Sequence, residues 1–206
     1  VLKLNLTKKF ITGMYPYSVM ASVFTPVHQK QNNPTMKITA ASQEWCGHTF
    51  TQMNRIEDGY KGHLFSYFEK EGDQEFILKN AMPEDEIWTM IRLAPEKLPK
   101  GQFKVIPGTL FQRLSHCEYN VYEATGELNV LKADQSISIY SITYKTLERT
   151  LSIRFKNTFP YHILSWEDKY DGMTTKATLK ETVMIDYWNK NKKSDRKLRE
   201  NLGLEY

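Results

Sequence analysis

The sequence has little of what marks a specialised class of protein. Cys46 and Cys117 are its two cysteines among 206 residues, too few for a disulfide scaffold and without the CxxC spacing of a redox or zinc site. Glycine (10) and proline (8) are sparse, and aromatic residues make up 13%, which is typical of a folded domain. No run of about 18 apolar residues occurs, so we expect no transmembrane segment.

A large excess of one charge is also missing. Lysine and arginine number 28 against 24 acidic residues, a net charge of +4 that is spread along most of the chain. The densest basic stretch is the tail, residues 190–199, where a solvated helix face is favoured over a phosphate-binding patch. The sequence therefore predicts no nucleic-acid partner.

Familiar catalytic motifs are absent as well. The chain contains no GxGxxG, GxxxxGK[ST], GxSxG or HExxH pattern, which removes the commonest nucleotide-binding, acyl-transfer and zinc-protease interpretations. We predict no catalytic residue, no metal ligand set and no cofactor. A non-catalytic protein is favoured, while an enzyme is not excluded.

What the chain does contain is the period-two alternation of half-buried strands. Leu2, Leu4 and Leu6 alternate with polar residues at the start, which puts the apolar side chains on one face of a strand. A bend is expected near Tyr15 and Pro16, a polar loop over residues 28–35, and turns near Asp58 and at residues 71–73. Further extended segments are expected over residues 36–54, 63–78, 101–107, 109–116, 118–124, 137–145, 150–155, 161–170 and 173–185.

One segment inside this pattern predicts a helix. Over residues 82–93, Pro83 suits a first helical position, and the three acidic residues 84–86 favour the positive helix N-terminus. Ile87, Met90 and Ile91 then share one face. A polar helix is expected at residues 194–202. About a dozen strands must curl or pair with another sheet, so we predict a mostly β fold: a large curved antiparallel sheet, as a half-barrel or barrel, with one short inserted helix and a C-terminal helix.

The chain length fits a single β domain over residues 1–206. Because the first residue is Val1 and the alternation is already under way there, we expect the natural chain to extend upstream.

The densest cluster of reactive side chains is Glu44, Trp45, Cys46 and His48. Cys46 and His48 stand two apart and would share a strand face, but a zinc site needs three or four ligands. A thiol nucleophile with His48 or His116 as its base is conceivable, although a small buried residue beside a packed tryptophan is favoured. Arg113 and His116 complete the set of candidate ligand-binding residues: Glu44, Trp45, Cys46, His48, Arg113 and His116.

Some strands carry apolar residues on both faces. Tyr140 and Ile142 oppose Ile137 and Ile139, so apolar surface remains beyond one simple core. This surface would line a ligand cavity, cover the inserted helix or dock a missing N-terminal part.

Several longer strings carry a resemblance. The segments at residues 3–10, 12–20, 42–48, 66–73, 91–99, 155–161, 187–188 and 198–204 resemble a family of Gram-negative envelope proteins of unassigned activity, some of which are labelled "septum formation inhibitor Maf". The resemblance implies a periplasmic or lipid-anchored protein. Maf proteins themselves are similar to α/β nucleotide pyrophosphatases with a Ser/Arg-rich signature, a pattern this chain lacks, so the label does not predict nucleotide hydrolysis.

Three functions remain open at this stage. The favoured hypothesis is a non-catalytic envelope protein that binds a lipid, another apolar small molecule or a protein partner on its curved sheet. The alternatives are a hydrolase acting on envelope material and a structural module of an envelope assembly.

Overall fold

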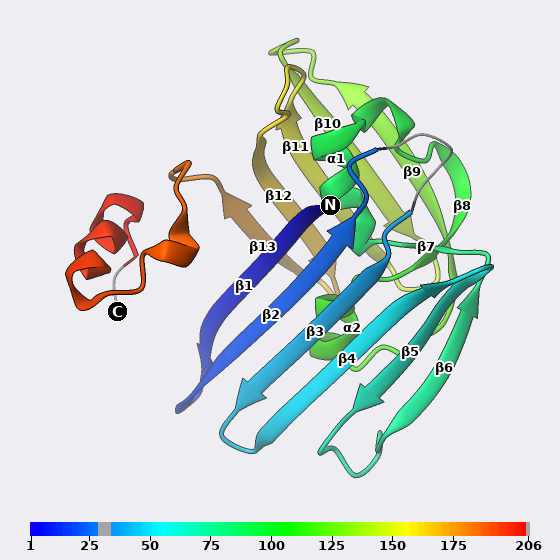
Figure 1. The fold of residues 1–206 in the computed structure, drawn as a ribbon. Coiled ribbons are helices and arrows are strands. Elements are labelled where there is room, and N and C mark those ends of the chain that lie inside the picture. The colour runs from blue at the N-terminus through cyan, green and yellow to red at the C-terminus, as the bar shows by residue number, and fades with distance from the viewer. Residues whose placement is uncertain (29–33, 205–206) are drawn as a thin grey trace.

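The computed structural model describes residues 1–28 and 34–204 (Figure 1). Two curved β-sheets face each other, and two short helices lie between them. This confirms the predicted mostly β, antiparallel fold, although the strands divide between two sheets and do not close into a barrel. Most of the predicted polar loop at residues 28–35 lies outside the described residues.

The first sheet is an antiparallel meander in chain order, β1-β2-β3-β4-β5-β6. Its inner face buries apolar side chains such as Val23, Ile38 and Met53, because residues two apart in a strand point to the same side. The strands are β1 (Leu2–Thr12), β2 (Tyr15–Thr25), β3 (Lys37–Glu44), β4 (Gly47–Ile56), β5 (Gly59–Phe65) and β6 (Gln74–Lys79).

The second sheet has the order β13-β12-β11-β10-β9-β8-β7 and is antiparallel except for the short parallel pairing of β7 with β8. Its strands are β7 (Met82–Pro83), β8 (Gly101–Ile106), β9 (Tyr122–Val130), β10 (Ile137–Tyr144), β11 (Arg149–Lys156), β12 (Ile163–Tyr170) and β13 (Met173–Thr178). β1 and β13 are therefore edge strands, as β6 and β7 are at the other ends of the two sheets, and β1 and β13 lie on the same side of the molecule (Figure 1).

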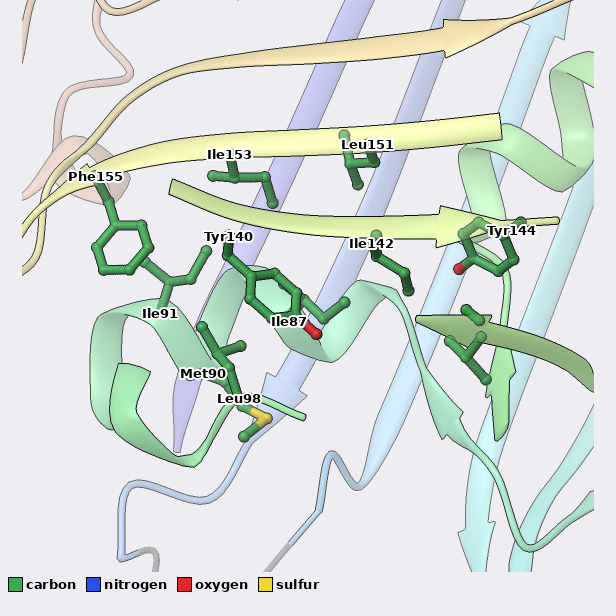
Figure 2. Close-up of a cluster of buried hydrophobic side chains, with 12 residues drawn as sticks. Ile87, Met90, Ile91, Leu98, Tyr140, Ile142, Tyr144, Leu151, Ile153 and Phe155 are labelled. Carbon is green, nitrogen blue, oxygen red and sulfur yellow. The ribbon is translucent and has the colours of Figure 1, made fainter. Parts of the chain in front are cut away.

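The predicted inserted helix is present as α1 (Asp85–Leu93), followed by a short 3-10 turn, η1 (Pro95–Lys97). Ile87 and Ile91 point from α1 toward Tyr140, Ile153 and Phe155 of the second sheet (Figure 2). The face of β10 that carries Tyr140 and Ile142 thus covers the inserted helix, whereas Ile137 and Ile139 on its other face are half-buried and belong to neither buried cluster. Pro83 does not begin the helix, because it belongs to β7.

The extended segment predicted at residues 109–116 is wrong. Residues Thr109–Ser115 form a second inserted helix, α2, which also contacts the first sheet. Leu110, Phe111 and Leu114 have helical spacing, but seven residues are too few for that period to stand out from a strand pattern.

Two further boundaries differ from the prediction. The first turn is at Gly13 and Met14 rather than at Pro16, and Gly13 has a φ of +55°, a conformation that glycine adopts readily at the first central position of a two-residue hairpin turn. At the other end, β13 stops at Thr178 instead of running to residue 185. The predicted turns after β4 and between β5 and β6 are both present.

The chain leaves the second sheet after β13. It continues through two 3-10 helices, η2 (Tyr187–Asn189) and η3 (Lys193–Leu202), which lie away from the two sheets in Figure 1. The predicted C-terminal helix is thus present, with 3-10 geometry.

Candidate functional site

An apolar cavity of about 320 Å³ lies on the side of the molecule where the edge strands β1 and β13 face each other. We call it the edge cavity. The inner face of β1 forms one wall, β12 and β13 form the opposite wall, and α1, α2 and β11 form the base. Its apolar lining residues are Leu4, Leu6, Ala21, Val23, Trp88, Leu110, Phe111, Leu114, Leu151, Trp166, Tyr170 and Met173. The volume is in the usual range of small-molecule sites.

The alternation of β1 builds half of this cavity. Leu4 and Leu6 point inward, whereas Asn5 and Thr7 point to solvent. Because β1 and β13 do not hydrogen-bond to each other, the two sheets stay apart at this side. Trp88 of α1 and Trp166 of β12 meet edge to face across the cavity wall, with ring centroids 6.3 Å apart.

A buried ion-pair network lies at the base of the edge cavity. Arg149 donates to Glu84 from both terminal nitrogens at 2.6 and 2.9 Å, and to Asp168 from Nε and Nη2 at 2.9 Å each. Its guanidinium carbon stands 3.8 Å from the ring centroid of Phe111. Burial alone would lower the pKa of Arg149, but the two carboxylates more than offset it and raise the pKa. Arg149 is therefore a fixed cation whose charge is compensated.

Asp85 also lines the edge cavity, and its carboxylate caps α2. Asp85 accepts hydrogen bonds from the backbone N–H of Thr109 at 2.9 Å and from the Thr109 hydroxyl at 3.0 Å. Burial raises the pKa of Asp85 to about 6, against the opposing effect of the Thr109 hydrogen bonds. This carboxyl group is thus able to change protonation near neutral pH.

A second hollow, the tip cavity, adjoins the first. It measures about 280 Å³ and lies between α2 and the far ends of β1 to β4. Its lining residues are Lys8, Phe10, Thr12, Tyr17, Ser42, Glu44, Thr49, Tyr67, Phe68, Arg113, Leu114 and His116. Lys8 and Leu114 line both cavities, so the apolar space continues into a more polar one.

The polar end of the tip cavity is organised around Glu71. Arg113 donates to both Glu71 oxygens at 2.7 Å, and His116 Nδ1 lies 2.6 Å from Glu71 Oε1. Burial would raise the pKa of Glu71, but the hydrogen bonds from Arg113, Ser66 and His116 lower it to about 2. The same groups line a larger hollow of about 610 Å³ beside the β5–β6 connection. Glu71 thus holds Arg113 and His116 in place.

The structure separates the six residues that the sequence singled out. Glu44, Arg113 and His116 come together on the tip cavity. Trp45 and Cys46 form the exposed turn between β3 and β4. His48 is exposed on β4 and does not line the cavity.

The predicted common strand face for Cys46 and His48 is wrong, because Cys46 belongs to the turn. Its N–H donates to Glu44 Oε2 at 2.6 Å, and the Glu44 carboxylate raises the pKa of the Cys46 thiol. A raised pKa keeps the thiol protonated, which is the opposite of what an activated nucleophile needs. Over residues 1–28 and 34–204, no three His, Cys, Asp or Glu side chains group in a way that could hold a metal ion.

The residues that form the edge cavity were not singled out by the sequence. Lys8, Trp88, Arg149 and Trp166 lie on four different elements, and no motif joins them. The alternation of Leu4 and Leu6 was the available signal, since it marked an apolar face on what proved to be an edge strand. In the described part of the chain, no helix is long and apolar enough to cross a bilayer.

Comparison with known proteins found no family model, no curated protein and no solved structure that matches the chain.

Proposed function

We propose that this protein binds the apolar part of a small molecule, such as an acyl chain, in the edge cavity. The observation that supports this proposal is the cavity of about 320 Å³ between two sheet edges, whose walls are formed by leucine, tryptophan and phenylalanine side chains. Its volume has room for roughly ten water-sized groups. Each methylene group moved there from water contributes about 0.8 kcal/mol, so a medium-length chain would bind well.

The ligand that fits best is amphipathic, with an acidic group. Lys8 stands where the edge cavity meets the tip cavity, and its ammonium group lies 5.0 Å from the ring centroid of Phe10. Within the described residues Lys8 has no ion-pair partner, whereas Arg149 is compensated by Glu84 and Asp168. A carboxylate or phosphate at Lys8 would leave the apolar tail in the edge cavity. A place in the cell envelope is part of this proposal and rests on the resemblance.

A hydrolase is the second candidate, and Asp85 is the observation that favours it. Asp85 lines the edge cavity and has a raised pKa, as general acids often do. Glu84 and Asp168, the other carboxylates among the described residues that line the cavity, are both engaged by Arg149, however, so this lining offers Asp85 no free carboxylate as a partner. The binding proposal needs no such partner and is therefore preferred.

The test is titration calorimetry with a long-chain fatty acid on Leu6→Asp and Thr7→Asp. Both substitutions add a carboxylate to β1, but Leu6 faces the edge cavity and Thr7 faces solvent. We expect Leu6→Asp to weaken binding at least about tenfold, since it puts a charge against the apolar tail. Thr7→Asp should bind like the unmodified protein.

A third variant distinguishes a loss of binding from a loss of folding. Thr175 lines the cavity from the exposed edge strand β13, so Thr175→Trp should fill the cavity while the fold, followed by circular dichroism, is kept. Equal binding by all four proteins would contradict the proposal. So would the absence of any heat of binding in the unmodified protein.

A further inference from the structure

A further hollow, which we call the Glu86 cavity, is separate from the edge cavity and the tip cavity. It measures about 540 Å³ and lies where the turn between β4 and β5 meets α1 and η1. This turn is at the end of the first sheet away from the turn between β3 and β4 (Figure 1). Among the described residues, none lines both the Glu86 cavity and either of the other two.

A buried carboxylate forms part of the wall of this cavity. Glu86, in the first turn of α1, is only 5% exposed. Its Oε2 accepts a hydrogen bond from the backbone N–H of Thr35 at 3.0 Å, and no cationic side chain of the described residues forms an ion pair with it. Burial raises the pKa of Glu86, because the hydrogen bonds from Thr35 and the charge of Arg55 offset only part of the lost hydration. The Glu86 carboxylate is therefore incompletely compensated.

A buried chain of hydrogen bonds fixes the position of Glu86. The hydroxyl of Thr35 lies 2.7 Å from that of Thr25, which in turn lies 2.8 Å from the hydroxyl of Thr89. Thr89 donates to the backbone carbonyl of Glu86 at 2.8 Å, and the hydroxyl of Tyr60 donates to the carbonyl of Thr35 at 2.8 Å. Side chains from β2, β5 and α1 thus hold the carboxylate in a preformed place.

The same cavity contains an arginine without a carboxylate partner. Nε of Arg55 donates to the carbonyl of Ile56 at 2.8 Å, and its guanidinium carbon lies 5.8 Å from the ring centroid of Tyr60. Glu57 and Asp58 also line the cavity, but within residues 1–28 and 34–204 neither carboxylate forms an ion pair with Arg55. Backbone and ring contacts therefore hold the guanidinium at the cavity with its charge available to a ligand.

The two charges are close to each other but not in contact. Arg55 lowers the pKa of Glu86, yet the two side chains form no ion pair. The remaining lining includes the apolar side chains of Met82, Met90 and Pro99. Small-molecule sites of this size usually combine apolar walls with a few fixed polar groups. A ligand that carries an ammonium group, a carboxylate and an apolar group would match this lining.

We propose that the Glu86 cavity binds a small zwitterion, namely an amino acid with an apolar side chain. Its ammonium group donates to Glu86, its carboxylate accepts from Arg55, and its side chain lies against Met82 and Met90. Hydrogen bonds between charged groups are stronger than neutral ones, and the ammonium group removes the cost of leaving the buried Glu86 carboxylate uncompensated. The inference goes beyond the binding of an apolar ligand in the edge cavity, because the two sites are separate.

The experiment is titration calorimetry with three probes that share one side chain. L-leucine carries both charges, N-acetyl-L-leucine lacks the ammonium group, and L-leucine amide lacks the carboxylate. We expect L-leucine to bind at least about tenfold more tightly than either derivative, since each derivative loses one charged contact.

Two variants assign the contacts to their residues. Arg55→Gln, at an exposed position, should lower the affinity for L-leucine at least about tenfold and leave that for L-leucine amide unchanged. Glu86→Gln should cause a similar loss with L-leucine and leave the affinity for N-acetyl-L-leucine unchanged. The control is Arg154→Gln, at an exposed position of the second sheet, which should bind L-leucine normally.

The result does not depend on Glu86→Gln being folded, because the exposed Arg55 tests the same site. Absence of any heat of binding with L-leucine would overturn the proposal. So would equal affinity for the three probes, or unchanged binding of L-leucine by Arg55→Gln. Fatty-acid binding should be unchanged in Arg55→Gln, which separates this inference from the proposal for the edge cavity.

Discussion

Arg149 and Glu84, 65 positions apart in the sequence, form a buried two-point ion pair at 2.6 and 2.9 Å. Glu84 immediately precedes α1, and Arg149 begins β11, so the pair ties the inserted helix to the second sheet. Tyr144 donates a further hydrogen bond to Glu84 at 2.5 Å. The base of the edge cavity is therefore held by charge and hydrogen bonds as well as by packing.

Replacing Arg149 should be strongly destabilising. Arg149→Met leaves the carboxylates of Glu84 and Asp168 without their shared partner in a buried position, which costs about 3–5 kcal/mol of unfolding free energy. Urea denaturation measures this loss of unfolding free energy. Arg154→Met on the same strand, at an exposed position, should change stability by less than about 0.5 kcal/mol. If the two variants were equally stable, the network would have no structural role.

The triple variant Arg149→Met/Glu84→Gln/Asp168→Asn tests the reason for that loss. Because it removes the uncompensated charges together with the arginine, it should recover part of the stability lost in Arg149→Met. A triple variant less stable than Arg149→Met would contradict the electrostatic explanation.

The raised pKa of Asp85 predicts that the stability of the protein depends on pH in a specific way. Its pKa is raised to about 6 in the folded protein from an ordinary value of 3.8, so the folded state binds this proton more tightly than the unfolded state does. The stabilising contribution is present below about pH 4 and is lost as the pH rises through about 6. The Asp85→Asn variant cannot ionise at this position and does not lose this contribution. As the pH is raised from about 4 to above 6, the unfolding free energy of the variant minus that of the unmodified protein should therefore increase by about 1–3 kcal/mol.

The control for this measurement is Asp171→Asn, in the exposed turn between β12 and β13. Its stability should run parallel to that of the unmodified protein across the same range. A flat difference curve for Asp85→Asn would show that the Asp85 carboxyl titrates normally.

Lys8 should discriminate between ligands by their headgroup. If its ammonium group pairs with the ligand, Lys8→Gln weakens the binding of a fatty acid by about 1–3 kcal/mol and leaves the binding of the matching fatty alcohol unchanged. Calorimetry with the two ligands measures the difference. Lys3→Gln, on the solvent face of the same strand, is the matched control. An equal loss for acid and alcohol would mean that Lys8 acts by packing alone.

Glu44 should suppress the reactivity of Cys46. Because the Glu44 carboxylate raises the pKa of the Cys46 thiol, Glu44→Gln should increase the thiolate fraction at pH 8 and speed alkylation by iodoacetamide several-fold. Cys117→Ser protein removes the background of the second cysteine. Unchanged alkylation would show that the carboxylate does not control the thiol.

Local sequence pattern predicted much of the fold. The alternation of Leu2, Leu4 and Leu6 marked β1, and the acidic start with Ile87, Met90 and Ile91 marked α1. Neither pattern says which strand faces which. The division into two sheets, the short helix α2 and the early end of β13 depend on contacts between segments far apart in the chain, which propensity over seven or eight residues does not specify.

The site was harder to predict for the same reason. The edge cavity draws Leu6 from β1, Trp88 from α1, Phe111 from α2 and Trp166 from β12. The ion-pair network at its base joins Arg149 to Glu84, which is 65 positions away in the sequence, and to Asp168, which is 19 positions away. Reactive side chains that stand close in sequence, such as Cys46 and His48, were easier to notice but lie on an exposed turn and strand.

The edge cavity contains its own reporters. Trp88 and Trp166 line it, whereas the other two tryptophans, Trp45 and Trp188, are exposed elsewhere. In the variant Trp45→Phe/Trp188→Phe, the remaining emission therefore comes from the cavity wall. A titration of this variant with a brominated long-chain fatty acid is the most direct test of the binding proposal. Saturable quenching that is weakened by Leu6→Asp but not by Thr7→Asp is the predicted result, and emission that stays constant throughout the titration would contradict it.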